Sequence, residues 1–387
     1  MTRARGVNGS RSRPSGAAYS AANRPRPPSS ARWPGTAART VALGLVGAFG
    51  LSGCNEDPDA GDDGRTYFSE STTQAYEIGL PEARLGPLDE RVSFGSIADI
   101  LATPSGYFVA DGLDPRIVLL DRNLDPVRIV GREGEGPGEY KFPSRLARAD
   151  DRILALDGGN GRVAYLTLEG DFVASQRIPG FASAVALHPE LGLLVAGSEF
   201  PDHYLARVTA QGDAAFGRIP EELRVDAGGL FRWPVDLVTV TADGMIHVLD
   251  ADQLALVSFR PDGALASVTF LPRDMRAREL ESARETDEVF GGPTRVLGTQ
   301  MVTTLRPLQD GRLFAGITSV RPDSATTKGL VLDLKRLEAI PLIFPADRDR
   351  QSARGARVYL EGLDRAMVNP MATASLETAP VELVARD

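Results

Sequence analysis

The sequence has little of several residue types that often carry chemistry: one cysteine, three histidines and three lysines among 387 residues. A single cysteine excludes an intramolecular disulfide, so the fold must be held together by a large apolar core. No two histidines stand at a metal-ligand spacing such as i, i+4, which argues against a histidine-based zinc site. The sequence also lacks a Gly-x-Ser-x-Gly elbow, the usual local signal of a serine hydrolase.

Acidic residues are absent from the first 53 positions, which carry eight arginines and many Pro, Ser, Ala and Gly. This segment is therefore predicted to lie outside the fold. Subtracting its eight charges leaves 35 basic against 52 acidic side chains in residues 54–387, a formal net charge of −17 (35 − 52). An acidic surface repels phosphate backbones and anionic headgroups, which argues against nucleic acid as a partner and against adhesion to anionic lipid.

An uncharged stretch runs from Thr40 to Gly53, after Arg32 and Arg39 and directly before Cys54. Basic, apolar and small residues in this order are typical of a signal peptide, and the stretch is shorter than the ~20 apolar residues of a transmembrane helix. Leu51-Ser52-Gly53-Cys54 resembles the bacterial lipobox, which implies cleavage before Cys54 and lipid on its thiol. The alternative is a buried thiol in a cytosolic protein.

The predicted organisation is a signal peptide at 1–53, a lipidated cysteine with an acidic tether at 54–74, and a globular domain at 75–387. The tether is polar and rich in turn formers, as a flexible linker is. The predicted location is the cell envelope, with membrane contact through the lipid anchor alone. Asn55 replaces the aspartate that favours inner-membrane retention in some bacteria, so delivery to the outer membrane is favoured.

Short apolar strands separated by turns recur along the globular domain. The first copy comprises Ile97–Ala102, Tyr107–Asp111, Arg116–Asp121 and Pro126–Val130. The second comprises Arg145–Ala149, Arg152–Asp157, Arg162–Thr167 and Phe172–Ile178. Later copies begin near Ala184, Val235, Val302 and Arg357, the last of them partial. In both of the first two copies, the second strand ends on Asp and an Arg follows five residues later.

The copies start about every 40–50 residues, a spacing typical of β-propeller blades. We therefore predict an all-β, six-bladed propeller of four-stranded antiparallel blades, with Ala75–Leu80 pairing into the last blade to close the ring. A seven-bladed ring or two stacked β-sandwiches are the alternatives, but sandwiches give no reason for the repeated Asp-to-Arg spacing. Helix-favouring residues at Asp274–Phe290 predict an inserted helix between blades four and five, with Asp274 as its N-cap.

The segment Gly131–Tyr140 reads Gly-Arg-Glu-Gly-Glu-Gly-Pro-Gly-Glu-Tyr. It resembles the Gly-x-Gly-Pro-Gly-Glu-Phe loop of the NHL-like and TolB-like six-bladed propellers found among bacterial lipoproteins, with Tyr140 in place of Phe. The resemblance covers about residues 75–387 and matches the later blades less well. It implies the propeller fold and a location outside the cytoplasm, and it implies no particular activity.

Polar residues at the turns are the first candidates for a site. They are Asp111, Arg116, Asp157, Asn160, Arg162 and Asp250. A ring of such carboxylates at one mouth of the channel would suit a cation. The favoured interpretation is structural, because Asp before a tight turn bonds its own backbone and the paired arginines can satisfy it across the turn.

Loop residues are the second group of candidates. Glu133, Glu135 and Glu139 would repel phosphate, which argues against a nucleotide-binding loop despite the neighbouring glycines. Carboxylates suit calcium, but an ordered Ca²⁺ site needs six to eight oxygens, so no cofactor is predicted and calcium stays the alternative. Trp233 and Phe290 place aromatics in loops that can contact a ligand, although packing between blades is the favoured interpretation.

Two main functions remain open. The favoured one is a monomeric ligand-binding or protein-interaction module for a small molecule, glycan, peptide or envelope protein, because it requires no residue that the sequence lacks. The alternative is a calcium- or zinc-dependent hydrolase or lyase in the central channel, with Asp111, Asp157, Asn160 and Asp250 as candidate ligands. A scaffold subunit of an envelope complex is a third possibility and would present a large apolar patch.

Overall fold

The structure is a computed structural model that describes residues 63–197, 200–224, 236–278, 300–321, 324–343, 356–370 and 375–386. These residues belong to one compact unit, Gly61–Asp387. Cys54, Trp233 and Phe290 lie outside the described residues, as does most of the predicted inserted helix. No helix in the described ranges is long and apolar enough to cross a bilayer.

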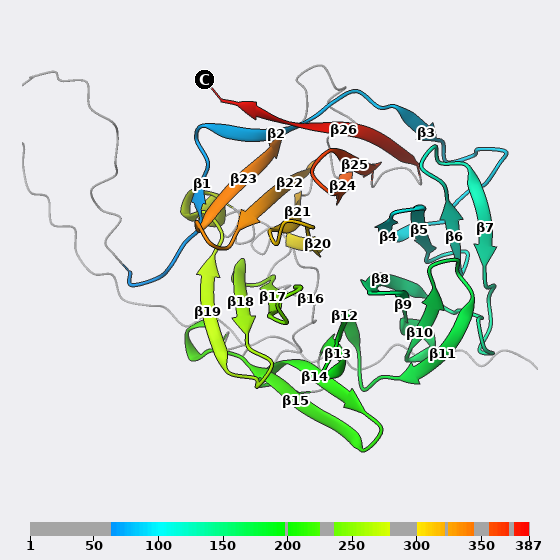
Figure 1. Ribbon diagram of the computed structural model, residues 1–387, viewed down its shortest axis with the longest axis horizontal. Coiled ribbons are helices and arrows are strands. Elements are labelled where there is room, and N and C mark those ends of the chain that lie inside the picture. The colour runs from blue at the N-terminus through cyan, green and yellow to red at the C-terminus, as the bar shows by residue number, and fades with distance from the viewer. Residues whose placement is uncertain are drawn as a thin grey trace, which may run out of the picture. The chain divides into compact units, whose positions relative to one another are not determined.

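The described chain is mostly β-structure, in four-stranded antiparallel sheets that form a propeller-like ring (Figure 1). Four sheets are separate. The first two contain β4 (Ile97–Thr103), β5 (Gly106–Asp111), β6 (Arg116–Leu120), β7 (Pro126–Val130), then β8 (Pro143–Ala149), β9 (Arg152–Asp157), β10 (Arg162–Thr167), β11 (Phe172–Arg177). The next two contain β12 (Ala182–His188), β13 (Gly192–Gly197), β14 (His203–Thr209), β15 (Gly212–Arg218), then β16 (Leu237–Val240), β17 (Ile246–Asp250), β18 (Ala255–Phe259), β19 (Leu265–Phe270).

The remaining strands form one ten-stranded sheet. They are β1 (Ser69–Glu70), β2 (Gln74–Ile78), β3 (Ala83–Leu85), β20 (Gln300–Pro307), β21 (Leu313–Arg321), β22 (Ser324–Asp333), β23 (Glu338–Ile343), β24 (Ala356–Glu361), β25 (Arg365–Pro370) and β26 (Leu376–Ala385). The six separate blades that the sequence predicts are therefore not observed, because the described residues form four separate four-stranded sheets and this ten-stranded sheet. The reason is β2, which pairs in parallel with β23 and antiparallel with β26 and so joins two sets of strands.

The first strand of each set lies nearest the centre of the ring (Figure 1). Contacts between these strands run from β4 to β8, β12, β16, β20 and β24, and from β24 back to β4. Side chains on these six strands therefore meet around one axis, although the strands are far apart in the sequence.

Apolar clusters fill the spaces between neighbouring sheets. Phe108 and Ile117 of the first sheet, for example, pack with Leu146 and Ala164 of the second. Because each sheet is covered on both faces, its middle strands are largely apolar rather than alternating, and β5 is buried along its whole length. The continuous apolar runs in the sequence follow from this stacking.

The start of the domain is held against the fourth sheet by aromatic and guanidinium groups. Tyr67 and Phe270 have ring centroids 5.4 Å apart, and the guanidinium groups of Arg273 and Arg276 lie over them at 4.6 and 4.9 Å. Both arginines belong to the helical residues 273–278, so this helix starts one residue before the predicted N-cap Asp274. Two short 3₁₀ helices, η1 (Gly158–Asn160) and η2 (Glu221–Leu223), complete the described elements.

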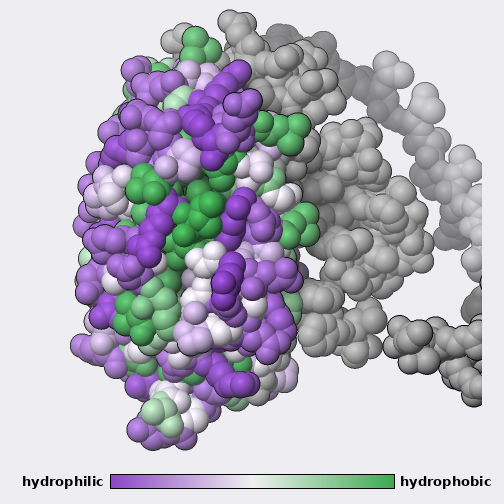
Figure 2. Space-filling model, turned by 90° about the vertical axis from the view of Figure 1, so that its right-hand side faces the viewer, coloured by the Kyte–Doolittle hydropathy of each residue, from purple (hydrophilic) through white to green (hydrophobic). Residues whose placement is uncertain are grey.

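The side of the ring drawn in Figure 2 is mainly hydrophilic. The face in Figure 2 shows hydrophobic side chains in small groups with hydrophilic side chains around them. Exposed apolar residues of the outermost strands β7 and β11 are Val127, Ile129 and Val173.

A buried polar chain crosses the fourth sheet. His247 Nδ1 lies 2.9 Å from Ser258 Oγ, and His247 Nε2 lies 3.2 Å from Thr241 Oγ1. Thr241 donates its one hydroxyl proton to Asp243 at 2.6 Å, so Nε2 of His247 carries the proton donated to Thr241. Burial lowers the pKa of His247 from 6.5 to about 4, and the nearby Asp243 carboxylate opposes this shift only partly.

The buried polar chain around His247 leads to a prediction of how the unfolding free energy depends on pH. Because the pKa of His247 is lower in the folded protein than in the unfolded chain, acidification from pH 6.5 toward pH 4 protonates the unfolded state first. We expect this difference in the protonation of His247 to lower the unfolding free energy by up to about 3 kcal/mol over this range. Denaturant unfolding at several pH values should show a shallower acid loss in His247→Gln than in the wild type. The control His203→Gln should follow the wild type, and equal slopes for all three proteins would contradict this account.

Candidate functional site

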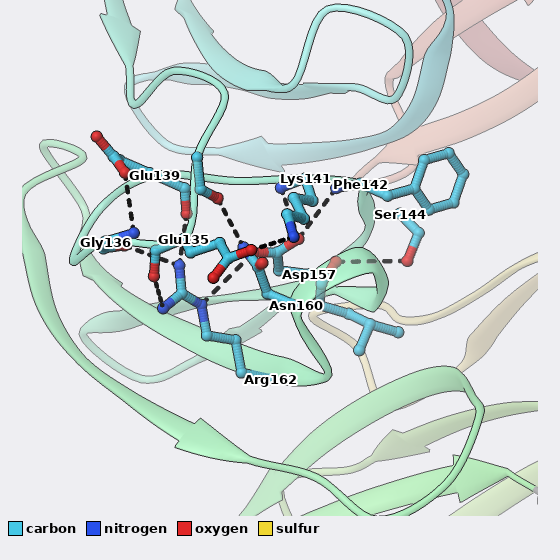
Figure 3. Close-up of polar contacts among 11 residues, drawn as sticks. Glu135, Gly136, Glu139, Lys141, Phe142, Ser144, Asp157, Asn160 and Arg162 are labelled. Atoms are coloured by element: carbon cyan, nitrogen blue, oxygen red, sulfur yellow. Dashed lines mark hydrogen bonds and ion pairs between the residues drawn. The ribbon is translucent and has the colours of Figure 1, made fainter.

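The carboxylate of Asp157, at the end of β9, is the centre of the most extensively bonded loop in this part of the ring (Figure 3). Asp157 is fully buried. Its Oδ1 accepts hydrogen bonds of 3.0 Å from the backbone N–H groups of Lys141 and Phe142. Its Oδ2 accepts a 2.6 Å bond from Asn160 and lies 3.5 Å from Nε of Arg162. Asp157 therefore fixes the chain that enters β8.

Arg162 and Asn160 hold the glycine-rich loop beside Asp157. The Arg162 guanidinium donates to the carbonyl of Glu135 at 3.0 Å and to those of Gly136 and Glu139 at 2.8 and 2.7 Å. Asn160 donates to the carbonyl of Gly134 at 2.9 Å. Three predicted site residues thus come together, but their polar atoms bond the protein's own chain. This arrangement immobilises a loop and leaves these groups little capacity for a ligand.

Glycine is required at the start of this loop. Gly131 has φ +79°, and a Cβ there would lie 2.4 Å from a ring carbon of Tyr140 and 2.5 Å from the carbonyl of Gly138. Tyr140 itself is fully buried. The glycine and tyrosine of the loop pattern are therefore explained by close packing.

The three loop glutamates do not converge on a common point. Glu135 forms an ion pair with Lys141, whereas Glu133 is exposed. Glu139 accepts from the backbone N–H of Gly136 and from Arg132, both at 2.9 Å. These two bonds, the backbone one first, hold the pKa of Glu139 below its ordinary value. Glu135 and Glu139 are thus bonded by groups in and next to the loop.

The candidates in the other sheets are also bonded within the protein. Asp111 accepts 2.9 Å bonds from the backbone N–H groups of Gly95 and Ser96. Arg116 donates to the carbonyl of Ser93 at 2.6 Å, and its ion pair is with Asp114 rather than across the turn with Asp111. Asp250 is fully buried and accepts from the Tyr204 hydroxyl at 2.6 Å and from the Gln253 N–H at 2.8 Å.

The structure does not gather the nominated metal ligands. Asp111, Asp157 and Asp250 end strands of three different sheets. Within the described ranges, no group of three or more His, Cys, Asp or Glu side chains is placed to hold a metal ion. Ser258 and His247 are of the types used in hydrolases, but they are 5% and 3% exposed and lie inside a sheet stack.

A second polar cluster lies at the axis of the ring, on first strands. Asp99 of β4 is fully buried and accepts from Arg306 of β20 at 2.8 Å. Arg145 of β8, with Arg357 and Tyr359 of β24, lies close enough to interact electrostatically with this pair. Sequence reasoning missed this cluster. The available signal was a charged residue within an apolar predicted strand, such as Asp99 within Ile97–Ala102.

A narrow cavity of about 10 Å³ adjoins this axial cluster, which is room for about one water-sized group. Arg145, Arg306, Val185 and Thr303 are among its lining residues. Tyr359 is 3% exposed, and burial raises its pKa to about 12, so the phenol keeps its proton. Polar groups from three sheets and one small space are thus brought together at the axis.

The loop network makes a prediction for stability. Asp157→Ala leaves the backbone N–H groups of Lys141 and Phe142 without their acceptor and removes the buried ion-pair partner of Arg162. We therefore expect a loss of about 3–5 kcal/mol in unfolding free energy. Asp151→Ala is the control, because the Asp151 side chain is 80% exposed and should cost less than about 1 kcal/mol. Equilibrium urea unfolding measures both. Similar losses for the two variants would mean that the buried network is not a major support of the fold.

No protein-family model matches the chain. Among solved structures, a protein from Bacteroides fragilis described as exported is 12% identical, with a TM-score of 0.51 over 83% of this chain and 99% of its own. A DUF4221 family member from Bacteroides vulgatus is 11% identical, with a TM-score of 0.55 over 80% of this chain and 99% of its own. Virginiamycin B lyase from Staphylococcus aureus is 9% identical, with a TM-score of 0.46. The first two likenesses support the propeller-like fold, and the third is too weak to bear on fold or activity.

Proposed function

We propose that this protein is a lipid-anchored, extracytoplasmic β-propeller that binds a small ligand at the central axis. The observation that carries the proposal is the axial cluster, where polar groups at and beside a small cavity are buried without a partner. Arg357 Nε, Tyr359 Oη and Thr303 Oγ1 all lack a hydrogen-bond partner. Thr303 lines the cavity, and Arg357 and Tyr359 belong to the axial cluster beside it. Because a buried polar group without a partner costs about 1–3 kcal/mol, these groups favour a site completed by a ligand.

We further propose that the ten-stranded sheet comprises two blades joined by β2, which together with the four separate sheets would make a six-bladed ring. The run β20-β21-β22-β23 is one antiparallel set of four, and β24-β25-β26 with β3 is another. On this interpretation β2 is an additional strand that closes the ring between two blades. The continuous contacts among six first strands support it.

The metal-dependent hydrolase or lyase has less support. Its candidate ligands Asp111, Asp157, Asn160 and Asp250 each bond groups of the protein. The axial cluster has three guanidinium groups and one carboxylate, which repel a metal cation rather than attract it. A binding module requires only the groups that the axis already presents.

Thermal stability tests the binding function. Phosphate, succinate, glucose, N-acetylglucosamine, Ca²⁺ and Zn²⁺ are added in turn to the wild type, with an EDTA arm for the metals. Binding to the native state must raise the midpoint, and we expect at least one non-metal probe to raise it by roughly 3 °C or more near saturation.

Two matched variants locate the effect. Val185 lines the cavity, whereas its cross-strand partner Val195 is not among the residues that line it. Val185→Ile narrows the cavity and should reduce the shift, and Val195→Ile should keep it. An EDTA-sensitive shift with Ca²⁺ or Zn²⁺ alone would favour the metal enzyme, and no shift with any probe would contradict a ligand site at the axis.

The anchor is tested separately from the ligand. If Cys54 is lipidated, the protein purified from envelopes should enter the detergent phase of Triton X-114, and mass spectrometry should find an acylated Cys54 as its first residue. Cys54→Ser should lose both properties. Ser52→Ala is the control and should keep them, because a small residue remains in the lipobox-like segment. A wild-type protein that stays in the aqueous phase would refute the anchor.

A further inference from the structure

We infer that the axial cavity binds a small oxyanion, either the carboxylate or the phosphate end of its ligand. This inference rests on the proposed function and names the chemistry of the same site. The axial cluster of Asp99, Arg145, Arg306, Arg357 and Tyr359 contains three positive charges and one negative charge among the described residues. Its net charge of +2 (3 − 1) stands in contrast to the net charge of −17 over residues 54–387.

The single carboxylate is fully engaged. Asp99 accepts from the N–H groups of Ile100 at 3.0 Å and Leu146 at 2.8 Å, and from Arg306 at 2.8 Å. One carboxylate oxygen therefore accepts from a backbone N–H group, and the other accepts from both a backbone N–H group and Arg306. Asp99 neutralises Arg306 and cannot neutralise the other two arginines as well.

Arg145 and Arg357 bond uncharged carbonyl groups. Arg145 donates to the carbonyls of Ser183 and Thr303, both at 3.2 Å. Arg357 donates to the carbonyls of Ile97 and Ala98 at 3.2 and 2.6 Å. In the described part of the chain, no carboxylate lies within ion-pair distance of either guanidinium. Two guanidinium charges thus remain without a counter-charge at the axis.

Donors that lack an acceptor point to the same chemistry. Nε of Arg357 is buried with no hydrogen-bond partner, as is the hydroxyl of Tyr359, which is 3% exposed. Burial lowers the pKa of Arg145, but a guanidinium remains protonated at neutral pH. Guanidinium N–H groups and a protonated phenol can all donate, and a carboxylate or phosphate presents several acceptor oxygens in the planar or forked geometry that arginine matches.

The size of the cavity limits what enters. The space takes about one water-sized group, so one oxygen of a terminal carboxylate or phosphate fits and a whole sugar ring does not. A cation is disfavoured by the two unneutralised guanidinium charges. Charge, hydrogen-bond donors and size therefore select the same class of ligand.

Isothermal titration of the purified full chain tests the inference. Phosphate and succinate are the two oxyanion arms, glucose is the neutral arm and Ca²⁺ the cationic arm, all at constant ionic strength. We expect saturable one-to-one binding of phosphate or succinate. The oxyanion that binds with the higher affinity shows whether the negative group of the ligand is a phosphate or a carboxylate.

Variants assign the binding to the axial cluster. Arg145→Met keeps the apolar stem but removes the charge and should weaken oxyanion binding at least tenfold. Tyr359→Phe removes only the hydroxyl and should weaken it several-fold, which gives a conservative second variant if Arg145→Met does not fold. Arg148→Met is the control, because Arg148 lies on the same strand but is exposed, and it should bind as the wild type does.

The outcomes separate the two proposals. Saturable binding of glucose or Ca²⁺ without either oxyanion would overturn the oxyanion inference and leave an axial ligand site possible. Oxyanion binding that is unchanged in Arg145→Met and Tyr359→Phe would overturn the assignment to this cluster. Absence of binding in every arm would overturn both the inference and the proposed function.

Discussion

The carboxylate of Asp99 is the constraint on which the axis of the ring depends. It is fully buried on β4 and bonds the backbone of β8 through Leu146 and the side chain of Arg306 on β20. A buried charge without partners is costly, so these bonds fix the relative positions of three first strands. The same bonds commit Asp99 to one arginine. The positive character of the cavity therefore follows from how the ring is held at its centre.

Buried carboxylates also fix the positions of chain segments at the loops. Asp111 and Asp157 each accept two backbone N–H groups from the segment that enters the first strand of their sheet. Apolar clusters supply the contacts between sheets, and these buried carboxylates set the positions of chain segments that apolar packing alone would not fix. In this protein a fully buried aspartate is thus a structural element, and the unneutralised groups at the axis are arginines.

The sequence predicted local structure better than long-range pairing. The predicted strands Pro126–Val130, Arg152–Asp157 and Arg162–Thr167 are confirmed to the residue, because apolar runs bounded by turn residues are local signals. The ten-stranded sheet was not predictable, since it depends on β2 pairing with strands more than 250 residues away. The axial cluster was missed for the same reason: Asp99, Arg145, Arg306 and Arg357 are single residues in separate strands, and only ring closure brings them together.

The location of an anion in a crystal tests the central claim most directly. Selenate has the shape and charge of a small oxyanion, and its selenium can be located by anomalous diffraction from crystals soaked at millimolar concentration. The account predicts an anomalous peak in the axial cavity within hydrogen-bonding distance of the Arg145 and Arg357 guanidinium groups. Selenate found only at the outer surface, with the axial cavity filled by ordered water, would contradict it.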